Sequence, residues 1–101
     1  MGSYEIAGIR DLFDIIPMYE TLDGNFPNHE ANPLHTETLD AIRAKVKETG
    51  AEFGAAFDGD ADRCGFIDDQ GNIIPMDLFT ALIAQDILSD KGNGTVTILY
   101  D

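Results

Sequence analysis

The sequence predicts a single α/β domain, in which a mixed, mostly parallel sheet with one antiparallel hairpin strand carries helices on its faces. The chain has 101 residues, which is the usual size of one domain with one hydrophobic core. Segments with helical spacing of apolar residues alternate with short runs of β-forming residues, an order typical of a layered α/β domain. The sequence contains neither an internal repeat nor a low-complexity segment that would indicate another architecture.

Two short elements and a long loop are expected in the first third of the chain. Residues 5–13 have apolar residues at helical spacing and predict a helix, which Gly8 weakens. Residues 15–19 predict a strand, and Pro17 confines it to a sheet edge or to a gap in the hydrogen-bond ladder. Residues 20–35 show no periodicity and include a glycine, two prolines and three asparagines, so we expect a loop.

The next helix has the clearest signals in the chain. It is expected to begin at Thr36 or Glu37 and to end at Thr49, where Gly50 supplies the stop. Its buried face consists of Leu39, Ile42 and Val46. A short apolar run over residues 51–57 then predicts a buried strand that leads into an acidic loop.

The last part of the chain predicts a hairpin, a helix and a strand. Residues 64–67 and 73–74 flank the turn 68–72 and should pair as a hairpin. Pro75 opens a helix to about Ser89, with a wide apolar stripe. Residues 95–100 are rich in β-forming residues and predict a final strand.

The charge excludes two classes of partner. The formal net charge is −13, from 19 acidic and 6 basic side chains. So few cations cannot neutralise several phosphates, and they disfavour an anionic membrane surface, so no nucleic acid or membrane is expected as a partner.

The one cysteine, Cys64, fits a reducing cytoplasm and is expected to be a small core residue. No secretory signal is visible, and residues 1–3 resemble an initiator with a cloning remnant.

The loop 58–63 predicts a divalent-metal site. Asp58, Asp60 and Asp62 alternate with Gly59 and Ala61, whose small side chains let the backbone curl until the carboxylates converge. Two such charges about 4 Å apart repel by roughly 4 kcal/mol at an effective dielectric of 20, so three of them need a counter-ion or a proton. Oxygen ligands favour magnesium, manganese or calcium. We place the loop beyond the carboxyl end of a parallel strand, where α/β sheets bind ligands.

Arg63 ends this loop and can act in two ways. It could clamp a phosphate that also coordinates the metal, or it could form a salt bridge with a neighbouring aspartate. Two other motifs share the aspartate pattern. One alternative is a non-enzymatic calcium-binding or interaction module, but a calcium loop of the EF-hand type would have glycine at Arg63 and glutamate at Asp69. An aspartyl-nucleophile phosphatase of the haloacid-dehalogenase type would have threonine or valine at Asp62.

Two segments of the chain resemble the α-D-phosphohexomutases, in particular the phosphomannomutase/phosphoglucomutase branch. The first is Asp23-Gly24-Asn25-Phe26-Pro27-Asn28-His29 with Asn32-Pro33 after it, and the second is Ala56-Phe57-Asp58-Gly59-Asp60-Ala61-Asp62-Arg63. One helix and one strand separate them, as in the second, metal-binding domain of that family. The similarity covers nearly the whole chain, and residues 95–101 resemble the first strand of the third domain.

The resemblance implies an isomerase, an intramolecular phosphotransferase of carbohydrate metabolism. It implies that Asp58, Asp60 and Asp62 bind Mg²⁺, that Arg63 is catalytic and faces the phosphate, and that His29 lies near the substrate. The family passes a phosphoryl group between a phosphoserine and the 1- and 6-positions of a hexose. Magnesium there offsets the charge of the transferring group.

The chain also departs from the family pattern. It has no Thr-Ala-Ser-His-Asn-Pro-like phosphoserine segment, no sugar loop and no phosphate loop. It is therefore expected to be a domain fragment that binds metal weakly, is inactive alone, and needs the remaining domains of a parent chain to act on a hexose phosphate. The family's opening strand is also missing, and residues 95–100 are expected to take its place in the sheet.

Overall fold

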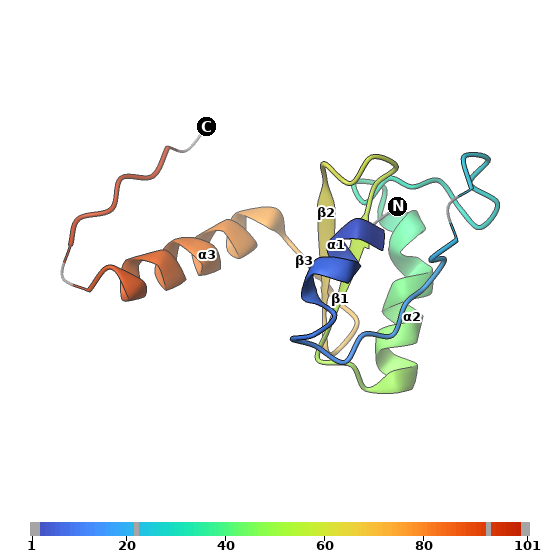
Figure 1. Cartoon of the computed structure of the whole chain (residues 1–101), viewed down its shortest axis with the longest axis horizontal. Helices are drawn as coiled ribbons and strands as arrows, with labels where there is room; N and C mark the ends of the chain where they lie inside the picture. The colour runs from blue at the N-terminus through green and yellow to red at the C-terminus, as the bar shows by residue number, and fades with distance from the viewer. Residues whose placement is uncertain (1–2, 22, 93, 100–101) are drawn as a thin grey trace.

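A computed structural model of the chain describes residues 3–21, 23–92 and 94–99 (Figure 1). Its elements in chain order are helix α1 (Ser3–Ile9), the 3₁₀ turn η1 (Thr36–Leu39), helix α2 (Asp40–Thr49), strands β1 (Phe53–Phe57), β2 (Cys64–Asp68) and β3 (Ile73–Ile74), and helix α3 (Met76–Asp90). The class, a small α/β domain, is confirmed. None of the described helices has the length and the apolar composition that crossing a bilayer requires.

The sheet has three strands in the order β1-β2-β3, and both strand pairs are antiparallel. The expectation of a mostly parallel sheet is therefore wrong. Parallel neighbours need a crossover of a dozen or more residues, whereas only residues 58–63 connect β1 to β2. So short a connection forces β2 to return antiparallel, and the acidic loop joins the two strands of a hairpin.

Two predicted strands are absent from the described part of the chain. Residues 15–19 run without strand pairing, since Pro17 offers no donor and Tyr19 has a left-handed backbone (φ 53°) that interrupts an extended run. Residues 95–99 also form no strand, so they do not fill the place of the missing family strand within this chain. Tyr100 and residues 1, 2 and 101 lie outside the described residues.

Helix α2 packs on the sheet and forms the core with it. The buried side chains are Leu39, Val46 and Ile67, with Ile42, Ala56 and Ile73 packed against them. At Gly54 of β1 an added Cβ would lie 2.9 Å from Val46 Cγ2, so the glycine permits this close approach. The predicted helix end is confirmed, because Gly50 has the left-handed conformation (φ 71°).

Helix α3 leaves the sheet after β3 and extends away from the rest of the molecule (Figure 1). Only its first turn is anchored, where the ring of Phe79 stacks on Phe66 of β2 with centroids 4.0 Å apart. The predicted helix is confirmed, but its apolar stripe is exposed: Leu78 and Leu82 are 61% and 60% accessible. Apart from Phe79, the large apolar side chains of this helix are exposed.

Candidate metal centre

The loop between β1 and β2 is closed by backbone hydrogen bonds. The N–H of Asp58 donates to the carbonyl of Arg63 (3.2 Å), and the N–H of Ala61 donates to the carbonyl of Asp58 (3.3 Å). Ala61 has a left-handed backbone (φ 62°), which is uncommon outside glycine and turns the chain back toward β2. The loop therefore curls tightly enough to bring its alternating aspartates together.

The three predicted metal ligands do converge. One carboxylate oxygen from each of Asp58, Asp60 and Asp62 lies within 4.8 Å of the others. Asp58 is fully buried, whereas Asp60 and Asp62 are exposed, so the cluster has one ligand in the protein and two at the surface. An all-oxygen set that opens to solvent fits a hard divalent cation, which keeps some of its water ligands. The residues present therefore fit the metal that the sequence predicts.

Arg63 holds the buried aspartate in place. Its Nε donates to Oδ2 of Asp58 at 2.6 Å, and its backbone N–H donates to Oδ1 at 3.3 Å. Burial raises the pKa of Asp58, but hydrogen bonds from Arg63 and Asp62 and the charge of Arg63 outweigh it, so the pKa lies below its usual value of 3.8. Asp58 is thus ionised at neutral pH and aligned for a cation.

The pKa of Asp62 is shifted in the opposite direction to that of Asp58. A hydrogen bond with Asp58 is the main cause that raises its pKa above 3.8, and the negative charges of Asp60 and Asp58 add to it. Three carboxylates this close favour keeping a proton among them. A divalent cation would replace that proton with a stronger positive charge.

The two sequence segments singled out above meet at one point. The Cζ atom of Phe26 lies 3.3 Å from the position that a Cβ would occupy at Gly59. Phe26 also has a left-handed backbone (φ 48°), and its N–H donates to the carbonyl of Asp23 (3.1 Å). No role for Phe26 was predicted from the sequence. Gly59, which leaves room for a neighbour, was the signal that could have indicated this contact.

His29 takes part in different contacts. Its ring meets that of Tyr19 edge to face, with centroids 5.4 Å apart, and its Nδ1 lies 2.8 Å from the carbonyl oxygen of Glu30. Neither contact joins it to the aspartates, so its place near the substrate stays a prediction. Cys64 is half-buried, in partial agreement with the expected core position.

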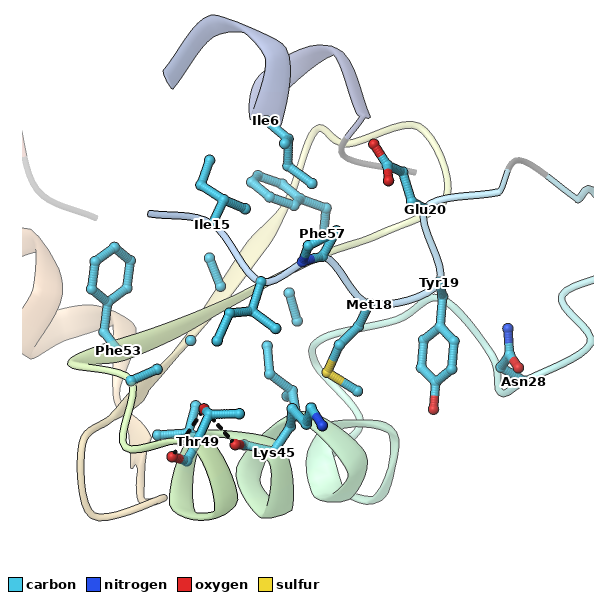
Figure 2. A pocket seen from close by; sticks show the side chains of 18 of the residues that line it. Ile6, Ile15, Met18, Tyr19, Glu20, Asn28, Lys45, Thr49, Phe53 and Phe57 are labelled. Carbon is cyan, nitrogen blue, oxygen red and sulfur yellow. Dashed lines mark hydrogen bonds between the residues drawn. The ribbon is translucent and has the colours of Figure 1, made fainter. Parts of the chain in front are cut away.

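A cavity of about 800 Å³ is lined by all residues of β1 and by none of the acidic loop or β2. Figure 2 shows side chains around it from α1 (Ile6), from the segment after α1 (Ile15, Met18), from α2 (Lys45, Thr49) and from β1 (Phe53, Phe57). The three aspartates do not line it. The cavity is mainly apolar and is distinct from the acidic cluster.

The fold and the loop together define an α/β domain with three clustered carboxylates, which could hold a divalent cation, at the tip of a hairpin. Residues 5–71 match the family described as phosphoglucomutase/phosphomannomutase, alpha/beta/alpha domain II. The chain belongs to this family. The predicted family resemblance is thereby confirmed.

Named relatives agree with this assignment. The chain is 47% identical over 88 residues to a phosphomannomutase/phosphoglucomutase of Pseudomonas putida, covering 87% of this chain and 19% of the relative. It is 42% identical over 94 residues to a phosphomannomutase of Methanocaldococcus jannaschii, and the match covers 92% of this chain and 20% of the relative. A solved phosphoglucomutase/phosphomannomutase family protein from Burkholderia thailandensis superimposes with a TM-score of 0.71 at 45% identity. The superposition covers 75% of this chain and 17% of that protein. The chain thus spans about a fifth of the length of these proteins.

Proposed function

We propose that this chain is the magnesium-binding domain of a phosphosugar mutase, an intramolecular phosphotransferase that interconverts hexose 1-phosphate and hexose 6-phosphate through a phosphoserine. One observation carries the proposal: oxygens of Asp58, Asp60 and Asp62 lie within 4.8 Å of one another in a domain of this family. Mg²⁺ held by these residues would offset the charge of the phosphoryl group in transfer. A cytoplasmic location belongs to the proposal and is supported by the unpaired thiol of Cys64.

The chain's own contribution is a preorganised set of charges. Arg63 holds Asp58 through Nε and its backbone N–H, which fixes the direction of the buried carboxylate. A guanidinium has five N–H donors, and both side-chain contacts of Arg63 use Nε, so donors are left for a phosphate. Its side chain is 48% exposed, which suits a residue that faces an anion beside the metal. His29 is proposed to approach the substrate from the loop that carries Phe26.

The phosphoserine, the sugar loop and the phosphate loop are proposed to come from further domains of a parent chain. The sequence contains none of their motifs, and the relatives are about five times longer than the matched region. Residues 1–101 alone should therefore bind metal weakly and convert no hexose phosphate. Measurable mutase activity of this chain alone would contradict that part of the proposal.

The structure gives less support to the two alternatives. An EF-hand calcium loop lies between two helices, whereas strands β1 and β2 flank the loop 58–63. A nucleophilic aspartate must reach its substrate, whereas the side chain of Asp58 is fully buried and paired with Arg63. The first observation disfavours an EF-hand, and the second disfavours a nucleophilic role for Asp58.

A metal titration of the chain tests the site. We expect Asp60→Asn to weaken Mg²⁺ or Mn²⁺ binding by about tenfold or more, because it removes one charged ligand of three. Asp69→Asn is the matched control, since Asp69 is exposed in the turn between β2 and β3 and lies outside the cluster. Equal affinities for the wild type and both variants would exclude the cluster as the metal site. Much tighter binding of Ca²⁺ than of Mg²⁺ would favour the calcium alternative.

A chimaera tests the enzymatic role. The matched 88 residues of this chain would replace the corresponding residues of the Pseudomonas putida relative, to which they are 47% identical. We expect the folded chimaera to convert glucose 1-phosphate into glucose 6-phosphate, and we expect Asp60→Asn within it to abolish the activity while Asp69→Asn retains it. A chimaera that folds and binds metal but has no activity would contradict the mutase assignment.

A further inference from the structure

Three residues other than glycine have a left-handed backbone in the described part of the chain: Tyr19 (φ 53°), Phe26 (φ 48°) and Ala61 (φ 62°). This conformation is unfavourable for a side chain as bulky as phenylalanine, so the surrounding contacts must hold it. Ala61 belongs to the acidic loop, and Phe26 packs on that loop at Gly59. Tyr19 meets the ring of His29, which follows Phe26 in the same segment. The strained positions therefore gather at the acidic loop and at the segment that touches it.

A tight turn sets the position of Phe26. Oδ1 of Asp23 accepts hydrogen bonds from the backbone N–H and from the side-chain amide of Asn25, both at 2.9 Å. The carbonyl of Asp23 accepts the N–H of Phe26 at 3.1 Å. Turns of this kind are favoured by aspartate and asparagine, because their short side chains bond the nearby backbone. The ring of Phe26 is therefore presented by a hydrogen-bonded turn.

The tip of the Phe26 ring covers the middle of the acidic loop. Its Cζ and Cε1 atoms lie 3.3 and 3.7 Å from the position that a Cβ would occupy at Gly59. Apart from the two chain neighbours of Gly59, Phe26 is the only described residue with an atom within 4 Å of that position. Those neighbours are Asp58 and Asp60, two of the three clustered carboxylates. The ring thus lies against the loop between two candidate metal ligands.

The hydrogen bonds of the acidic loop do not restrain this middle part. Asp58 and Arg63 tie the two ends of the loop together. Gly59 and Asp60 take part in none of the hydrogen bonds within the part of the chain that the structure describes. Packing against Phe26 is therefore the contact that restrains the part of the loop that leads to exposed Asp60.

We propose that Phe26 is a positioning residue of the metal site, and that it couples metal binding at the acidic loop to the segment 23–29. The inference rests on the proposed function, because it requires that the three aspartates bind a cation. The ring has its place on Gly59 while the loop is curled. A cation held by the carboxylates favours the same curled loop, so the ring and the cation stabilise one conformation.

Coupling between two binding contacts is reciprocal. If the ring strengthens metal binding by a given factor, the metal strengthens the packing of the ring by the same factor. Metal binding thus stabilises the turn from Asp23 to Phe26 and the chain that leads from it to His29. This role differs from simple packing. A contact that only stabilises the fold changes the free energy of unfolding and leaves the metal affinity of the folded chain unchanged.

An NMR titration of the whole chain with MgCl₂ at constant ionic strength tests the effect of the ring on the metal. We expect Phe26→Ala to raise the dissociation constant for Mg²⁺ by about fivefold or more, as is usual for coupled sites. Phe13→Ala is the matched control, because Phe13 is 52% exposed against 44% for Phe26 and its ring meets that of Phe53, outside the acidic loop. This control should bind Mg²⁺ like the wild type. Circular dichroism at the titration temperature checks that each variant is folded.

Hydrogen exchange in the wild type tests the effect of the metal on the segment and needs no substitution. Saturating Mg²⁺ should slow the exchange of the Asn25 and Phe26 amides by about the factor by which Phe26→Ala weakens binding. In the Phe26→Ala variant, the amide of Asn25 should exchange at the same rate with and without Mg²⁺. The amide of Ala61, which bonds the carbonyl of Asp58 inside the loop, should be slowed by Mg²⁺ in both proteins.

Asp60→Asn separates a failure of this inference from a failure of the proposed function. If Asp60→Asn weakens Mg²⁺ binding while Phe26→Ala binds like the wild type, the ring does not position the site, although the site itself is correct. The same conclusion follows if Phe13→Ala weakens binding as much as Phe26→Ala, or if saturating Mg²⁺ leaves the wild-type amides of Asn25 and Phe26 unchanged. A wild type that binds no Mg²⁺, or an Asp60→Asn variant that binds it equally tightly, would overturn the proposed site and this inference with it.

Discussion

The Nε atom of Arg63 lies 2.6 Å from Oδ2 of Asp58, a carboxylate with no exposed surface. The two residues stand at opposite ends of the acidic loop and are joined by two more hydrogen bonds: the N–H of Asp58 donates to the carbonyl of Arg63 (3.2 Å), and the N–H of Arg63 donates to Oδ1 of Asp58 (3.3 Å). This pair ties the two ends of the loop together. Asp60 and Asp62, between these ends, are exposed and complete the candidate metal site.

Replacing Arg63 by methionine should lower the thermal midpoint at neutral pH, because it leaves the buried carboxylate of Asp58 without its cation. The pKa of Asp58 is below 3.8 in the folded chain, so this pair stabilises the fold above that pH and loses its effect as the pH falls through the folded pKa. The difference between the wild type and Arg63→Met should therefore be largest near pH 7 and shrink toward pH 3.

Arg10→Met is the control for the Arg63 variant. Arg10 forms an exposed ion pair with Glu20, in which the side chains are 58% and 50% accessible. Exposed pairs contribute little to stability, so this variant should melt close to the wild type at both pH values. Calorimetry at each pH gives the comparison. A midpoint for Arg63→Met equal to that of Arg10→Met at pH 7 would show that the buried pair does not stabilise the loop.

Gly59→Ala tests the contact between the metal loop and Phe26. The new methyl group would lie 3.3 Å from Cζ of Phe26, closer than carbon atoms normally pack, so the ring or the loop must move. Overpacking of this kind costs about 1–3 kcal/mol, and the lower end is expected because Phe26 is 44% exposed. Urea denaturation of the variant measures the cost.

A double-mutant cycle separates this contact from an effect on the loop backbone. Phe26→Ala makes room for the methyl group, so Gly59→Ala should cost less in the Phe26→Ala background than in the wild type. Additive changes in the free energy of unfolding would mean that the two residues do not interact. Metal affinity measured on the same four proteins would show whether Phe26 also positions the aspartates.

Local elements could be predicted because their signals lie next to one another in the sequence. Gly50 ends α2 and Pro75 precedes α3, as expected. The expectation of a mostly parallel sheet was wrong because the composition of residues 51–57 suggested a buried parallel strand, whereas the six-residue connection makes β2 run antiparallel to β1. The strand expected at residues 15–19 depends on a nonlocal partner, which no local pattern specifies.

In the candidate site, too, local features could be predicted from the sequence and nonlocal ones could not. The cluster of Asp58, Asp60 and Asp62 could be predicted because all three belong to one short loop with small spacers. The complete burial of Asp58 and the packing of Phe26 on Gly59 could not, since both depend on segments that are distant in the sequence. Arg63 was given two roles. The structure shows the salt bridge, and the phosphate contact stays a prediction.

Ile67→Ala should destabilise the fold strongly. Ile67 is fully buried and packs with Leu39 and Val46, the other two buried apolar side chains of the described residues. Truncation of a buried isoleucine to alanine costs about 2–5 kcal/mol, which is a large part of the stability of a small domain. Circular dichroism during urea unfolding should show a much lower midpoint or no cooperative transition. Leu34→Ala, at a residue that is 66% exposed, should unfold close to the wild type.

The thiol of Cys64 should react slowly in the folded chain. Burial, the largest cause, and the negative charge of Asp58 raise its pKa from 9.0 to about 11. Because the thiolate is the reactive form, a rise of two pKa units predicts alkylation by iodoacetamide at pH 8 about 100-fold slower than in urea-unfolded chain. The same shift means that the thiol favours folding below pH 9 and ceases to do so as the pH rises from 9 through 11. Mass spectrometry of the alkylated product over time gives both rates, and equal rates in the folded and unfolded chain would contradict the raised pKa.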